Sequence, residues 1–177
     1  MKYKLSGNNL VFQMTGVTPI IWQAGLITLA VVLPSLAHVY HLPVRWILPM
    51  HWPIILTGLI FGWRSGMMVG LAAPLTNYLI TGYPQPLILL PMTVELIIYG
   101  FITGWIREHS SLNIFLNVGI ALIAGRVIFI LSVLMIGAFG ESFTGYLIAA
   151  MSPGIVGGLG QLVFLPFIAL YLLKAKS

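Results

Sequence analysis

Long apolar segments, separated by short polar or turn-forming stretches, run through the whole chain. Most of them are close to the roughly 20 residues that an α-helix needs to cross a bilayer. The pattern therefore predicts an all-α integral membrane protein with about six transmembrane helices, built as a single transmembrane domain over residues 1–177. The apolar segments cover roughly residues 18–37, 46–62, 66–80, 90–106, 112–136 and 146–173.

The composition leaves no room for a separate soluble domain. Hydrophobic residues make up 59% of the chain and charged residues only 6%, whereas a soluble domain carries about 25% charged residues. Cysteine is absent, which excludes disulfides and thiolate metal sites. The formal net charge of +5 does not call for a nucleic-acid partner, because the cations fall where membrane topology would put them. We predict no cofactor, no metal and no nucleic acid.

The stretch TGLIFGWRSGMMVG, residues 57–70, places an arginine among glycines at spacing four. In one continuous helix Arg64 would sit near the bilayer centre, at a cost of at least ~2.5–3.5 kcal/mol. A tight reversal between two helices avoids that cost, with Gly62 and Gly66 on either side of Arg64. Gly58 and Gly70 then lie on two helices that can pack closely.

The distribution of cations sets the orientation of the spans. Cytoplasmic loops of membrane proteins carry an excess of lysine and arginine. With a cytoplasmic N-terminus and six crossings, only Arg45 falls outside, and Arg126 lies within the fifth span. We therefore predict that both termini and Arg64 face the cytoplasm. The cations on that side are Lys2, Lys4, Arg64, Arg107, Lys174 and Lys176.

Residues 48–105 carry a family resemblance. They read LPMHWPIILTGLIFGWRSGMMVGLAAPLTNYLITGYPQP and continue to PMTVELIIYGFITGW. This stretch, with the six short spans and the glycine turn, resembles the S components of energy-coupling factor (ECF) transporters, which capture vitamins for uptake. Trp63 stands where the family turn often has proline.

The resemblance implies partners and a location. It implies a multi-pass, non-enzymatic protein of the bacterial plasma membrane that works with a transmembrane coupling subunit and two cytoplasmic ATPases. No G-x-x-x-x-G-K-[ST] nucleotide motif is present, so ATP coupling must come from the partners. Small residues on the first helix contact the coupling subunit in this family, and the matching positions are Ala24 and Thr28, with Gly25 adjacent. Packing inside the monomer is the alternative for Ala24 and Gly25.

Two ionisable residues within spans are candidates for a functional site, because charges inside a membrane are expensive to bury. Arg126 lies about 21 Å above the cytoplasmic start of the fifth span, at 1.5 Å per residue. Glu95 lies ~7–8 Å below the outer start of the fourth. In a hydrocarbon core about 30 Å thick both residues therefore lie in the outer half. They either form a structural pair or face a pocket and hold a polar ligand, and the two roles are compatible.

Further polar residues are expected in the same outer half. Tyr99 lies one turn from Glu95 on the same helix face, and Asn77 and Gln161 occupy the third and sixth spans. For Asn77 and Gln161 the alternative is a hydrogen bond between helices. His51 begins the second span as either a ligand-binding residue or an interfacial cap. Tyr83 lies at the outer boundary, where an aromatic belt is the default and a role in closing over the ligand is the alternative.

The resemblance, together with the polar residues inside the spans, favours a membrane-embedded subunit that binds a water-soluble vitamin or related micronutrient for ATP-driven uptake. A ligand-free structural or assembly subunit is the alternative. An intramembrane enzyme is less well supported, because no H-E-x-x-H motif is present and the chain has three carboxylates in all. The polar residues would suit a carboxylate such as pantothenate, or the polar edge of a pyrimidine, pyridoxine, a flavin or a corrinoid.

Overall fold

The protein is an all-α membrane protein. A computed structural model describes residue 11 and residues 17–137 and 142–174, and within these the chain is helical without strands. Lys2, Lys4 and Lys176, predicted to be cytoplasmic, lie outside the described residues. The helices are α1 (Thr18–Val39), α2 (Val44–Ile47), α3 (His51–Phe61), α4 (Trp63–Thr81), α5 (Pro86–His109), α6 (Ile114–Ile136) and α7 (Phe143–Lys174).

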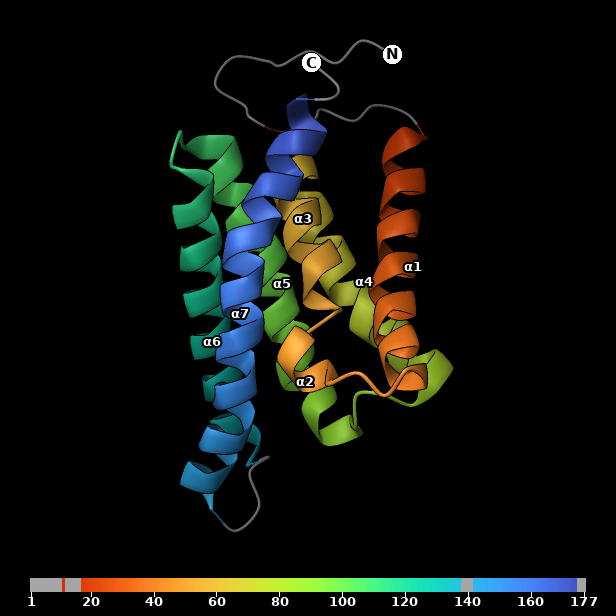
Figure 1. The fold of residues 1–177 in the computed structure, drawn as a ribbon, viewed down its shortest axis with the longest axis vertical. Coiled ribbons are helices and arrows are strands. Elements are labelled where there is room, and N and C mark those ends of the chain that lie inside the picture. The colour runs from red at the N-terminus through yellow and green to blue at the C-terminus, as the bar shows by residue number, and fades with distance from the viewer. Residues whose placement is uncertain (1–10, 12–16, 138–141, 175–177) are drawn as a thin grey trace.

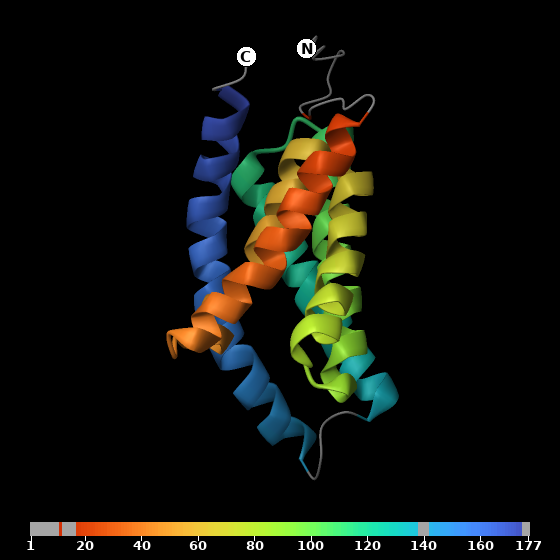
Figure 2. The same ribbon diagram turned by 90° about the vertical axis from the view of Figure 1, so that its right-hand side faces the viewer.

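Four of these helices, α1, α5, α6 and α7, are each long and apolar enough to cross a membrane. α4 has 19 residues, which is long enough to cross in length alone. α2 and α3 follow one another and together make one further passage, so the chain passes through the bundle six times, as predicted. α1 begins at the end of the bundle where α7 finishes (Figure 1). From the side, α1 crosses the bundle diagonally in front of α3 (Figure 2).

The predicted continuous span 46–62 is wrong, because the helix breaks at residues 48–50. Leu48 has a left-handed backbone with φ of 51°, and the 11-residue helix α3 begins only at His51. Pro49 explains the break, since proline disfavours helical geometry at the residue before it and lacks an N–H donor. At 1.5 Å per residue, α3 covers about half of a bilayer core. Its N-terminus therefore lies inside the bundle.

The predicted reversal is present, but Arg64 and Gly66 already lie in the first turn of α4. Gly62 alone separates α3 from α4, with φ of 84°, a backbone conformation that favours glycine. The backbone N–H of Trp63 donates to Glu108 Oε1 at 3.1 Å, so a carboxylate from the end of α5 satisfies a free donor at the start of α4. Arg64 is exposed, and its guanidinium carbon lies 5.2 Å from the centre of the Trp63 ring.

Gly58 and Gly70 lie on two successive helices as expected, and the close contacts of these glycines are made with α5. A Cβ added at Gly66 would overlap the carbonyl of Gly100, and one at Gly100 would overlap the carbonyl of Gly66. An added Cβ at Gly58 would also meet α5, and one at Gly70 would meet the Leu96 backbone. α5 is therefore held in close contact with α3 and α4, and this fixes the position of its buried polar residues.

Labelling of introduced cysteines tests the predicted orientation, because the natural chain contains none. Ser65 lies next to Arg64 and would be the natural position to label at the reversal. It suits the test poorly, since it is buried and its hydroxyl accepts a hydrogen bond from Gln23. Ser110 and Ser142 are both exposed and lie at opposite ends of α6. We expect an impermeant thiol reagent added outside intact cells to modify Ser142→Cys and to spare Ser110→Cys. The reverse pattern would contradict the cytoplasmic placement of the termini.

Candidate functional site

A buried carboxylate joins three helices at the centre of the site. Glu95 of α5 is 1% exposed. Its Oε1 accepts a hydrogen bond from the Tyr99 hydroxyl at 2.7 Å and lies 3.2 Å from Arg126 Nη1 of α6. Its Oε2 lies 3.8 Å from His51 Nε2 of α3. Glu95 and Arg126, expected at similar depth, are thus paired, and Tyr99 lies one turn along α5 as the sequence predicts.

Arg126 reaches Glu95 because α7 has no side chain in its path. A Cβ at Gly154 would lie 2.6 Å from Arg126 Nη2 and 2.8 Å from its Cζ. By sequence, Gly154 and Gly158 have the spacing of a small-residue pair that permits close helix approach. The ring of Phe129 lies 5.9 Å from the guanidinium carbon, within the range of a cation–π contact. Glycine at position 154 therefore makes space for a charged side chain.

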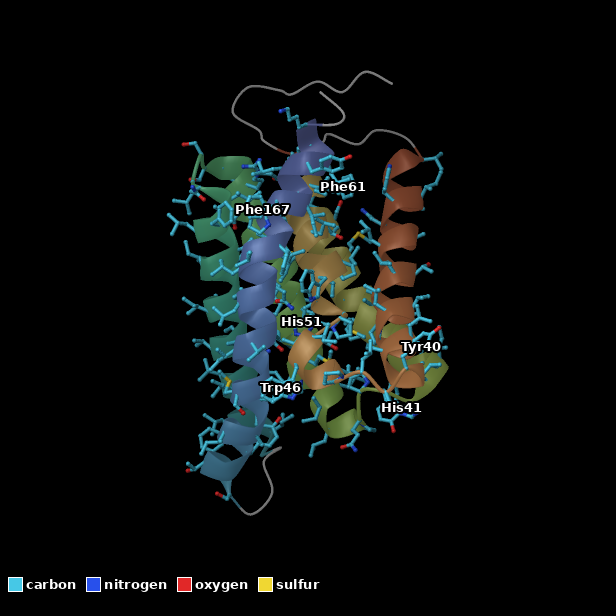
Figure 3. The ribbon with its side chains drawn as sticks, in the orientation of Figure 1. Tyr40, His41, Trp46, His51, Phe61 and Phe167 are labelled. Atoms are coloured by element: carbon cyan, nitrogen blue, oxygen red, sulfur yellow. The ribbon has the colours of Figure 1, made fainter. Side chains whose placement is uncertain are left out.

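His51 lies deeper than the sequence indicated. The interpretation as an interfacial residue near the outer boundary is wrong, because the break at residues 48–50 carries the start of α3 inward. Figure 3 shows His51 near mid-height, above Trp46 and His41. The residue is 3% exposed and its ring packs 5.5 Å from that of Tyr99. Neither ring nitrogen has a hydrogen-bond partner among the described residues.

The side chains of His51, Glu95 and Arg126 line a cavity of about 740 Å³. Such a volume lies within the range of small-molecule sites, which are mainly apolar with a few convergent polar groups. All seven described helices contribute to it, α1 through Pro34. Its polar lining residues include His51, Asn77, Tyr83, Glu95 and Arg126, and its apolar lining includes Pro34, Leu48, Met50, Met92, Phe129 and Pro153.

Asn77 has one half of its amide in use. Its Nδ2 donates to the Tyr83 carbonyl at 2.8 Å, which ties the end of α4 to the connection before α5. The alternative considered for Asn77, a hydrogen bond between helices, is replaced by one to this connection. Its Oδ1 is buried without a partner in the described part of the chain. Tyr83 itself is 54% exposed at the edge of the cavity.

Gln161 lies apart from the main cavity. It lines a second cavity of about 410 Å³ next to α6 and α7, together with Tyr99 and Arg126. Gln161 is fully buried, yet neither its amide nitrogen nor its oxygen has a partner among the residues described. The alternative considered for Gln161, a hydrogen bond to another helix, is thus not found in the described part of the chain. Arg126 lines both cavities, so Gln161 shares the second cavity with one residue of the main site.

The three residues expected at the coupling contact lie on the outer surface of α1. Ala24, Gly25 and Thr28 are all exposed, and nothing lies within 4 Å of a Cβ built at Gly25. The Thr28 hydroxyl donates to the carbonyl of Ala24 at 2.8 Å along the same helix. The alternative that Ala24 and Gly25 pack inside the monomer is therefore wrong, and this face is open to lipid or to another protein.

The comparisons with known proteins agree with this arrangement. Residues 20–175 match the family model described as ECF transporter, substrate-specific component. No curated protein and no solved structure matches the chain. The family match includes every helix that lines the two cavities. The chain therefore belongs to the substrate-specific components of ECF transporters.

Proposed function

We propose that this subunit binds a small, water-soluble vitamin or related micronutrient in the main cavity. The observation that carries this proposal is the convergence of Glu95, Arg126 and His51 on a cavity of about 740 Å³, with the Tyr99 hydroxyl holding Glu95 from behind the lining. Removing charges from water inside a membrane is costly, even for a pair. A purely structural core could instead have been built from apolar residues, so retention of these groups favours a ligand.

Each predicted site residue has a place in this proposal. Arg126 is the principal anchor, because its planar fork can hold an acceptor of the ligand while Nη1 stays with Glu95. Asn77 offers its unpaired Oδ1, and Tyr83 borders the opening. His51 supplies a ring nitrogen from the floor of the cavity. Gln161 offers its side-chain amide in the second cavity, which Arg126 also lines.

The transport partners in this proposal are a transmembrane coupling subunit and two cytoplasmic ATPases in the bacterial plasma membrane. The exposed small residues Ala24, Gly25 and Thr28 on α1 would let a partner helix approach closely, as small residues do in membranes. The sequence contains no P-loop of its own, so the energy for uptake has to come from the ATPases.

Deletion of the ATPases separates binding from transport. Cells that produce this subunit but lack the ATPases should still bind its nutrient and should fail to concentrate it. The measurement is uptake of labelled nutrient, with surface binding at 4 °C as the paired control. Undiminished accumulation in the deletion strain would mean that the protein is an autonomous carrier and would contradict the proposed partnership.

A further inference from the structure

The charges at the main cavity already cancel. Among the described residues that line it, Glu95 and Arg126 carry opposite charges and lie 3.2 Å apart. A carboxylate entering this space would place a second negative group beside Glu95 and would have to share Arg126 with it. Two carboxylates that both contact Arg126 lie close together, and like charges repel strongly in a poorly solvated site. The site is thus matched to a ligand without net charge.

The hydrogen-bonding groups that remain are of both kinds. On the acceptor side, Asn77 Oδ1 has no partner in the described chain, and Glu95 Oε2 lies 3.8 Å from His51, beyond hydrogen-bonding distance. On the donor side, Arg126 pairs with Glu95 through Nη1 and has further N–H groups to offer. The two ring nitrogens of His51, one donor and one acceptor when neutral, are also unpartnered.

We propose that the ligand is a neutral molecule that presents a hydrogen-bond donor and an acceptor side by side, as an amide, a lactam or an amino-heterocycle does. This inference rests on the proposed function and narrows its substrate class. The N–H of the ligand would donate to Glu95 Oε2 or Asn77 Oδ1, and its adjacent carbonyl or ring nitrogen would accept from Arg126. A ligand that lacks the donor or the acceptor would leave a buried protein group unpaired, and this would weaken its binding. Carboxylate-bearing nutrients are excluded because they would place a second negative charge beside Glu95.

The test uses the wild-type protein and identifies its ligand directly. Purified protein is incubated with the low-molecular-weight fraction of yeast extract, washed, and analysed by native mass spectrometry, and the bound molecule is identified by its accurate mass. A bound molecule that is neutral at pH 7 and contains an amide or amino-heterocycle is the expected result. A bound carboxylic acid would overturn the inference while leaving the proposed function standing. Protein that retains no molecule would overturn the proposed function itself.

A variant provides a second readout that a merely structural Glu95 would not produce. Glu95→Gln leaves Arg126 without its counter-charge, so the cavity becomes positive. Thermal stabilisation is compared for the matched pairs pantothenol and pantothenate, and nicotinamide and nicotinate, together with the neutral ligand found above. We expect the variant to lose roughly tenfold in affinity for the neutral ligand and to move its preference towards the carboxylate of each pair. An unchanged preference would count against the charge argument.

Discussion

Replacing Arg126 with alanine is expected to lower ligand affinity roughly ten- to a hundredfold, which corresponds to the ~1.5–3 kcal/mol of a charged hydrogen bond. The same change should destabilise the fold by about 3–5 kcal/mol, because breaking a buried pair strands the remaining charge. The stranded group is Glu95, which is 1% exposed and would keep only the hydroxyl of Tyr99 at 2.7 Å and the more distant His51. Thermal stability and ligand affinity, measured together, report the two effects.

Two further variants separate binding from scaffolding. Arg126→Lys keeps the charge but loses the planar fork, so it should restore part of the stability and little of the affinity. The double variant Arg126→Met, Glu95→Gln removes both charges and should fold nearly as well as the parent. If that double variant also binds ligand as tightly as the parent, Arg126 is scaffolding and the binding site lies elsewhere.

The sequence predicts the membrane fold well because hydrocarbon imposes strong rules on composition. Apolar segments of spanning length, and an arginine that would otherwise lie at mid-membrane, are enough to place six passages and the reversal at Gly62. The break at residues 48–50 escapes this reasoning. Leu48, Pro49 and Met50 are all apolar, so hydropathy does not mark them, and the left-handed Leu48 is visible only in the backbone.

The site is predictable only where polarity marks it. Glu95 and Arg126 stand out as charges within spans, and helical spacing adds Tyr99. The depth of His51 depends on the break before α3, so the sequence alone places it too near the surface. Gln161 is singled out as a polar residue within the sixth span, but it lines a different cavity. The apolar lining residues, such as Met92 and Phe129, have no signal that separates them from ordinary core residues.

Glu108 and Gly154 illustrate a second kind of residue that the sequence does not reveal. Glu108 lies near the end of a span, where a charge is unremarkable, yet it accepts the N–H of Trp63 across helices. Gly154 makes space for the guanidinium of Arg126. Both roles depend on residues more than twenty positions away, so local patterns cannot indicate them.

Alanine at Gly66 should destabilise the protein by about 1–3 kcal/mol, the usual cost of forcing extra atoms into a packed interior. The added methyl group would overlap the carbonyl of Gly100 on α5, and backbone atoms cannot swing away as a side chain can. In an open helical position the same substitution is favourable by up to about 1 kcal/mol. Gly25→Ala is the matched control, because nothing lies within 4 Å of its added Cβ, and it should leave thermal stability unchanged or raise it.

The reciprocal contact makes the interface between α4 and α5 testable as a unit. Gly100→Ala should cost as much as Gly66→Ala, since its added Cβ meets the Gly66 carbonyl. Once the two helices have separated to admit one methyl group, the second finds part of its space already open. The double variant should therefore be destabilised by less than the sum of the two single variants. Because α5 also carries Glu95, the same separation should weaken ligand binding, and strictly additive costs with unchanged affinity would show that these helices do not meet at this pair of glycines.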